Sequence, residues 1–281
     1  MNEEDMSPSL ERKRVVDTAW IFDVDGVITD IEKEEITEPL ILGHLVQILE
    51  RGEPIAFNTG RGIDWVESTV LNPLKAKISN QEILQNLFVV AESGGIQAIF
   101  NEDGSMNLQI DDSLKMPTVL DQKVLDLLQE KYSQSMRYEA KKTMITTKIK
   151  EGTSVEEFHK DQQEIAKDLQ RLIDSYGFTD KFKVDISTIG TNIMHKTTGK
   201  DKGSELILEW ISKRKIKPQR FIAFGDSIPD IPMAEKINEA GHPVELVYVG
   251  KNKLPKDNYP FKITRTQNSY DKGAVEFLSK I

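Results

Sequence analysis

The stretch Trp20-Ile21-Phe22-Asp23-Val24-Asp25-Gly26-Val27-Ile28-Thr29 decides the fold of this chain. It continues an apolar run that begins at Val15 and stops at two aspartates, a pattern typical of a buried strand in a parallel sheet. Ligands of open α/β sheets bind at the carboxyl ends of the strands, where Asp23 and Asp25 stand. Alternate side chains of a strand share one face, so we expect the two carboxylates to lie on the same side. Gly26 then permits a tight turn.

Three interpretations of these aspartates compete. They could be solvated acids at a strand end, as most Asp-x-Asp-Gly sequences are. They could open a Ca²⁺ loop, but Val27 and Ile28 follow where further oxygen ligands would be needed. They could also form a nucleophilic site assisted by Mg²⁺, because two close carboxylates repel unless a cation lies between them or one is protonated. The rest of the chain favours the third interpretation.

Composition indicates a soluble globular protein. The 281 residues are 38% hydrophobic and 30% charged, enough for one large or two modest domains. The net charge of −9 disfavours nucleic acid and anionic membranes as partners, and no apolar run reaches membrane-spanning length. The absence of cysteine excludes disulfides and thiolate metal sites and is consistent with a cytoplasmic protein. Residues 1–14 are polar and lack a secretory signal, so we predict a flexible tail.

Alternating strand and helix patterns flank a central insert. Apolar runs and helical periodicity predict the following elements: a helix at 40–49, strands at 54–58 and 87–91, a hairpin over 96–110, a helix at 201–213, a strand at 220–224, a helix at 232–240, a strand at 244–249 and a helix at 274–281. This is the pattern of a doubly wound α/β domain with a mostly parallel sheet.

The insert has a different character. Residues 101–191 show an amphipathic helix, a β-branched strand, a long helix capped by Thr153 or Ser154, and a further strand. We therefore predict two units, a Rossmann-like core from residues 1–100 and 192–281 and an inserted α+β cap from residues 101–191.

Four polar groups fall at strand ends or helix starts of the predicted core. They are Asp23 with Asp25, Thr59-Gly60-Arg61, Lys202 before Gly203, and Asp226 with Asp230. Each is common alone: a Gly-containing turn before a helix offers N–H groups to an anion, an aspartate after glycine usually caps a helix, and a lysine there is usually solvated. All four in this order on a repeating βα frame are uncommon.

With these motifs the chain resembles the haloacid dehalogenase superfamily. It is most similar to the branch with a large α/β cap of the C2 type, like the Cof-type and sugar phosphatases, inserted before the lysine motif. The resemblance implies that Asp23 is a nucleophile forming an aspartyl-phosphate and that Asp25 is the general acid and base. Relatives with aspartate at position 25 are phosphatases and sugar phosphomutases, whereas ATPases carry threonine there.

The resemblance also implies a ligand set. Mg²⁺ would bind Asp23, the backbone carbonyl of Asp25, and Asp226. Phosphate would be held by Thr59, the N–H of Gly60 and a lysine, with Asp230 and Arg61 in support. Lys200 and Lys202 both lie near the helix start, and Lys202 fits the Lys-Gly pattern better. Two departures stand out: Pro229 replaces the asparagine that precedes the last aspartate in many relatives, and Glu92-Ser93-Gly94 replaces Glu-Asn-Gly.

These motifs predict a Mg²⁺-dependent phosphatase for a small phosphorylated metabolite, such as a sugar phosphate or a related polyol or glycerate ester. The cap would close over the substrate. Asn192 and His195 lie in the 190–196 segment and are candidate substrate contacts, although an ordinary hinge strand explains them equally well. A phosphomutase with an activating bisphosphate and a metabolite-binding protein without catalysis are the alternatives.

Overall fold

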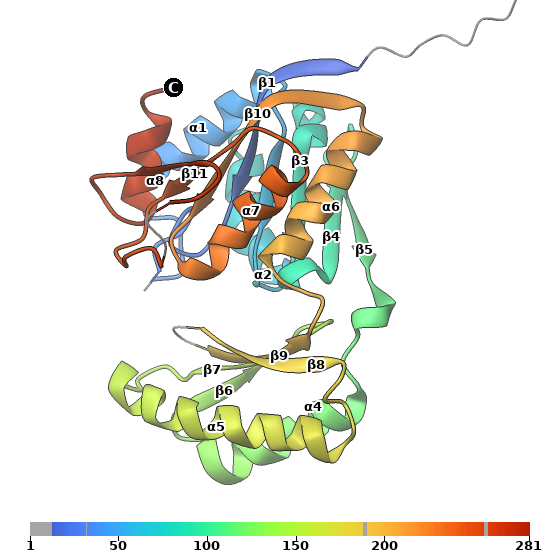
Figure 1. Cartoon of the computed structure of the whole chain (residues 1–281), viewed down its shortest axis with the longest axis vertical. Coiled ribbons are helices and arrows are strands. Elements are labelled where there is room, and N and C mark those ends of the chain that lie inside the picture. The colour runs from blue at the N-terminus through green and yellow to red at the C-terminus, as the bar shows by residue number, and fades with distance from the viewer. Residues whose placement is uncertain (1–12, 32, 188–189, 256–257) are drawn as a thin grey trace, which may run out of the picture.

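The computed structural model describes residues 13–31, 33–187, 190–255 and 258–281. A larger α/β body and a smaller α+β body face each other across the middle of the molecule (Figure 1). Most of the expected N-terminal tail lies outside the described residues, but Arg14 already begins the first strand. Within the described part of the chain, the helices are too short or too polar to cross a membrane.

The core is an eight-stranded sheet in the order β12-β11-β10-β1-β2-β3-β4-β5. Its pairs are parallel from β12 to β3, and β4 and β5 are antiparallel. The strands are β1 (Arg14–Phe22), β2 (Ile55–Asn58), β3 (Leu87–Ala91), β4 (Ile96–Phe100), β5 (Met106–Ile110), β10 (Ile216–Gly225), β11 (Val244–Tyr248) and β12 (Lys262–Arg265). The predicted doubly wound, mostly parallel sheet is confirmed.

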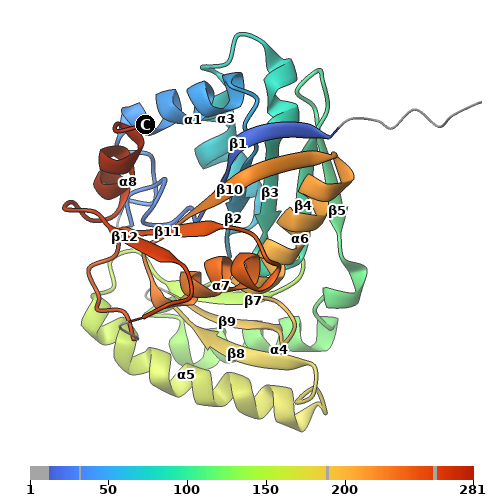
Figure 2. The same ribbon diagram turned by 45° about the horizontal axis from the view of Figure 1, so that its top comes forward.

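Helices cover both faces of this sheet. They are α1 (Pro39–Glu50), a helical segment made of α2 (Ile63–Val66), a π-helical turn (Glu67–Leu71) and α3 (Asn72–Lys75), then α6 (Lys200–Lys213), α7 (Ile231–Glu239) and α8 (Asp271–Leu278). α1 and α8 cover one face and α6 and α7 the other (Figure 2). Because strand side chains alternate, Trp20 and Phe22 of β1 pack with α1 and α8, whereas Ile21 packs with α6 and α7.

The cap is a four-stranded antiparallel sheet in the order β6-β7-β9-β8. Two helices cover the face that points away from the core (Figure 1). The cap elements are α4 (Thr118–Leu127), β6 (Met136–Glu139), β7 (Ile145–Ile149), α5 (Val155–Ser175), β8 (Phe182–Ile186) and β9 (Gly190–His195). Ser154 caps α5, since its hydroxyl accepts a hydrogen bond from the Glu157 N–H at 3.2 Å.

The structure places both cap boundaries later than the expected residues 101 and 191. β5 belongs to the core, because Phe100 and Met106 pair across the β4–β5 hairpin at the sheet edge. β9 belongs to the cap, because Ile193 pairs with Ile145 of β7 and its side chain enters the cap's apolar interior. The insert therefore runs from after Ile110 to the residues that follow His195.

Candidate active site

The site lies at the carboxyl ends of β1, β2 and β10. Asp23 follows β1 directly, and its N–H donates to the Phe224 carbonyl of the neighbouring strand at 3.0 Å. Asp226 follows β10, and Asp230 closes the short 3₁₀ turn after it. Carboxylate oxygens of these three aspartates lie within 4.8 Å of one another, and the side chains are largely buried. Parallel pairing of β1 with β10 thus brings together acids more than 200 residues apart.

Gly26 makes the close approach of Asp226 possible. Its φ is +70°, which favours glycine, and a Cβ at this position would lie 2.5 Å from Oδ2 of Asp226. Any larger residue would therefore push the loop after β1 away from the carboxylate.

Asp230 fixes the backbone around Asp226. Its Oδ2 accepts hydrogen bonds from the N–H groups of Asp226 (3.1 Å) and Ser227 (3.0 Å) and from the Ser227 hydroxyl (2.8 Å). Pro229 lies in the first turn of the 3₁₀ segment, where a missing N–H has no consequence. The departure from the family pattern at this position therefore leaves the geometry of Asp230 intact.

The lysine that reaches the acid cluster is Lys200, which differs from the preference for Lys202. The Lys200 ammonium lies 2.5 Å from Asp23 Oδ1 and 2.9 Å from Asp230 Oδ1, and it donates to the Asn58 carbonyl at 2.7 Å. Lys202 is two residues further along α6, about 200° around the helix axis. Its ammonium contacts Glu205 at 3.4 Å, and its side chain is 34% exposed.

Burial and mutual repulsion dominate the electrostatics of the cluster. Burial raises the pKa of Asp23 well above its ordinary value; Lys200 opposes this shift, and the neighbouring aspartates add to it. Burial, and after it Asp230, raises the pKa of Asp226 to about 7. The Lys200 pKa rises despite its burial, because Asp23 and Asp230 stabilise its charge. Close, desolvated carboxylates with hard oxygen donors fit a divalent cation such as Mg²⁺, which would relieve their repulsion.

Asp25 lies apart from this cluster, in an ion pair with Arg61. The Arg61 Nε donates to both Asp25 oxygens at 2.9 Å, and Nη2 contacts Oδ1 at 2.5 Å. The guanidinium also packs on the Trp65 ring, 4.2 Å from its centroid. Burial alone would lower the Arg61 pKa, but Asp25 and Glu34 raise it above its ordinary value. The Asp25 side chain is thus held beside the cluster, and its carboxylate is not one of the three gathered there.

Thr59 and Gly60 form the loop that follows β2. The Thr59 hydroxyl oxygen accepts a hydrogen bond from the Arg61 N–H at 3.1 Å, so its own O–H can donate to a ligand. The Gly60 carbonyl accepts a hydrogen bond from Lys141 of the cap at 3.0 Å. The loop therefore contacts both Arg61 and the cap.

The structure adds cap contacts that the sequence motifs did not indicate. Glu92 accepts hydrogen bonds from the Thr143 N–H and hydroxyl at 2.7 and 2.8 Å, and from the Lys142 N–H at 3.0 and 3.1 Å. The Lys141 pKa is lowered by burial against the opposing charges of Glu139 and Glu92. The only sequence signal was the Glu-Ser-Gly turn after β3, where Glu92 and Ser93 adopt positive φ values of 48° and 56°.

The two expected substrate contacts in β9, Asn192 and His195, lie on opposite faces of the cap sheet. Asn192 lies on the cap surface that faces the core, where it accepts a hydrogen bond from Thr146 at 2.7 Å. His195 has the same strand parity as Ile193, so it points toward the cap helices, edge-on to Phe182 at 5.6 Å, and bonds to Thr197. The structure therefore does not bring His195 to the site, because the alternation of β9 turns it away.

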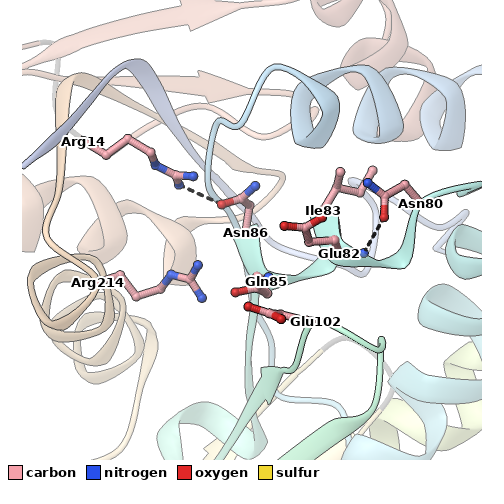
Figure 3. A pocket seen from close by; sticks show the side chains of 8 residues that line it. All are labelled: Arg14, Asn80, Glu82, Ile83, Gln85, Asn86, Glu102 and Arg214. Carbon is pink, nitrogen blue, oxygen red and sulfur yellow. Dashed lines mark hydrogen bonds between the residues drawn. The ribbon is translucent and has the colours of Figure 1, made fainter.

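A separate hollow of about 310 Å³ opens at the other end of the core sheet. Figure 3 shows Arg14, at the start of β1, donating to Asn86, with Arg214 and Glu102 nearby. The whole length of β1 lies between this hollow and Asp23, so it is not part of the candidate active site.

Comparisons with known proteins agree with this geometry. Residues 20–244 match the model of the haloacid dehalogenase-like hydrolase family. No curated protein matches the sequence significantly.

Solved structures share the fold. The C-terminal domain of a C. albicans trehalose-6-phosphate phosphatase is 15% identical, with a TM-score of 0.67 over 94% of this chain and 92% of that chain. A trehalose-6-phosphate phosphatase of Aspergillus fumigatus is also 15% identical, with a TM-score of 0.53 over 96% and 92%. An IMP-nucleotidase of Plasmodium falciparum is 14% identical, with a TM-score of 0.56 over 79% and 55%. The chain belongs to the haloacid dehalogenase-like hydrolase family, as its motifs predicted.

Proposed function

We propose that this protein is a Mg²⁺-dependent phosphomonoesterase for a small phosphorylated metabolite, acting through an aspartyl-phosphate on Asp23. The observation that carries the proposal is the pairing of buried Asp23 with the Lys200 ammonium at 2.5 Å, beside Asp226 and Asp230. A carboxylate kept among other acids with one firmly held cation suits attack on a phosphate ester, since the site can neutralise the incoming charge.

In the first step Asp23 attacks phosphorus. The Lys200 ammonium and the Val24 N–H both contact Oδ1 of Asp23, so Oδ2 would be the attacking oxygen. A bond forms between Oδ2 and phosphorus while the bond to the substrate oxygen breaks. Asp25, protonated in this step, gives its proton to the departing oxygen. Thr59, Gly60 and Lys200 would hold the phosphoryl oxygens, with Lys200 in the role that the motif had assigned to Lys202.

In the second step water attacks the aspartyl-phosphate. Asp25 now accepts a proton from that water, the bond between phosphorus and Oδ2 breaks, and inorganic phosphate leaves. Mg²⁺ held by Asp23, Asp226 and the Asp25 carbonyl would offset the repulsion between carboxylates and phosphate and stabilise the charge on the transferring group. Asp230 would support both Lys200 and the backbone of Asp226.

The polar surface of the cap favours a substrate that carries hydroxyl groups. Its core-facing surface carries Glu139, Lys141, Thr146, Lys148 and Asn192. Such hydrogen-bonding groups suit the hydroxyls of a sugar phosphate or a polyol or glycerate ester. Two of the structural neighbours are named as phosphatases of trehalose-6-phosphate, which is itself a sugar phosphate.

The first test is phosphate release from a panel of sugar phosphates, polyol phosphates, phosphoglycerates and nucleotides, with Mg²⁺ and with EDTA. We expect Mg²⁺-dependent release from one chemical class and a loss of roughly a thousandfold or more in Asp23→Asn. Release only in the presence of a bisphosphate activator would favour a phosphomutase instead. Binding of a panel compound without turnover would favour the non-catalytic alternative.

A further inference from the structure

A row of alternating charges runs from the cap to Asp25. Lys148 of β7 contacts Glu34 at 2.6 and 2.8 Å, Glu34 contacts Arg61 at 3.2 Å, and Arg61 holds Asp25 at 2.5 Å. The side chains are 6%, 25%, 7% and 33% exposed in that order, so two buried cations alternate with two partly exposed acids. Only Lys148 belongs to the cap.

Each member of this row is positioned by its neighbours. Arg61 presents a planar fork, and two of its nitrogens contact Asp25 while Nη1 contacts Glu34. Glu34 lies in the loop after β1 at a φ of +55°, a conformation that non-glycine residues rarely adopt. The pKa of Glu34 is lowered because Lys148 and Arg61 together outweigh the effect of its burial. The guanidinium therefore has one anchor on each side, and the outer anchor depends on the cap.

We propose that Glu34 and Lys148 are positioning residues that tie the orientation of Asp25 to closure of the cap; this rests on the function proposed above. With the cap in place, Lys148 fixes Glu34, Glu34 fixes Arg61, and Arg61 holds the Asp25 carboxylate. When the cap moves away, Lys148 leaves Glu34, and Arg61 loses its outer anchor. The Asp25 carboxylate is then correctly oriented for proton transfer only when the substrate is enclosed.

The row favours one step of the reaction. A guanidinium stabilises the ionised carboxylate, the form in which Asp25 accepts a proton from water during breakdown of the aspartyl-phosphate. With p-nitrophenyl phosphate as the probe, the leaving phenolate needs no proton, so formation of the intermediate does not depend on Asp25. Loss of the row should therefore slow breakdown selectively and make the intermediate accumulate.

The experiment compares Lys148→Met and Glu34→Gln with wild type in pre-steady-state release of p-nitrophenolate. We expect kcat to fall roughly tenfold, the loss typical of one charge-assisted hydrogen bond, with a burst close to one equivalent per active site. KM should fall in proportion, so that kcat/KM, which reports formation of the intermediate, stays nearly unchanged. Lys148→Arg keeps the charge and should restore most of the rate. The double variant should be no worse than either single variant.

The control is Lys131→Met, which removes a cap lysine that pairs with Asp168 and is 56% exposed. It should behave as wild type. Steady release without a burst in Lys148→Met, the same loss in Lys131→Met, or multiplying effects in the double variant would overturn the inference while wild-type turnover still supports the phosphatase. Absence of release by wild type from the probe and from the whole panel would instead overturn the proposed function, and this inference with it.

Discussion

Two lysines separated by one residue on α6 have different surroundings. Lys200 is buried against Asp23 and Asp230, whereas Lys202 pairs with Glu205 at the surface. We expect Lys200→Met to lower kcat/KM roughly a hundredfold, because it removes the cation that faces the developing phosphoryl charge. Lys202→Met should change it by less than about threefold, since exposed ion pairs contribute little. Steady-state kinetics of the two variants, with circular dichroism to check folding, make the comparison; the reverse ranking would restore Lys202 to the site.

The acid cluster should make the metal-free protein less stable as pH rises. The Asp226 pKa is about 7 in the folded protein and near 3.8 when unfolded, so between these values the folded state binds more protons. Stability should therefore fall from about pH 4 to pH 7, by at most about 1.4 kcal/mol per pH unit for this group. Melting curves in EDTA should show this decline, and Mg²⁺ should reduce it. A slope in EDTA that is the same in wild type and Asp226→Asn would contradict this account.

Strand ends made several site residues predictable from the sequence. Asp23 and Asp226 each follow an apolar run, so their meeting at one sheet edge follows from parallel pairing. The choice between Lys200 and Lys202 could not be made in the same way, because it depends on where α6 begins and thus on helical phase. Glu34 and Lys148 were missed because a loop residue and a cap residue meet only in the tertiary structure.

At the scale of elements, two helical glycines should respond oppositely to alanine. Gly203 of α6 lies against β2, where a Cβ would be 2.1 Å from the Asn58 Oδ1; Gly43 of α1 has open space around it. Gly203→Ala should cost about 1–3 kcal/mol in the free energy of unfolding, because α6 must move outward. Gly43→Ala should add about 0.5–1 kcal/mol through helix propensity. Urea denaturation of both variants measures these changes. If both substitutions changed the free energy of unfolding in the same direction, α6 would not pack as closely as described.

The elements themselves followed the hydrophobic pattern to different degrees. β3 and the C-terminal halves of β1 and β10 are buried apolar runs that only a central sheet accommodates, so these strands were predictable. β12 was not, because Lys262–Arg265 is a short edge strand with charged ends and one partner, and its burial pattern gives no period-2 signal.

At the scale of the whole molecule, Glu92 joins the core to the cap. Its carboxylate accepts hydrogen bonds from Lys142 and Thr143 in the loop that joins β6 to β7 of the cap. Glu92→Ala should raise hydrogen exchange at Lys142 and Thr143 roughly tenfold, since their N–H groups lose their acceptor, and leave β1 unchanged. Glu156→Ala, on the exposed surface of α5, is the matched control. Unaltered exchange in the β6–β7 loop of Glu92→Ala would show that other contacts hold the cap in place.

The two-unit organisation was predictable because the βα alternation breaks and then resumes. The boundaries were not predictable, since the sequences of β5 and β9 indicate strands without indicating which sheet they join. Only their pairing partners assign them to the core or the cap. Contacts across the two units, such as that between Lys141 and Gly60, depend on both boundaries and on the orientation of the cap.

The central claim is that Asp23 carries the phosphoryl group. The most direct measurement is rapid acid quench of the enzyme during turnover of its substrate, followed by mass spectrometry of the peptide that contains Asp23. The account predicts a phosphorylated peptide in wild type whose label maps to Asp23 and is absent from Asp23→Asn. Full turnover with no label on that peptide, or undiminished turnover by Asp23→Asn, would contradict it.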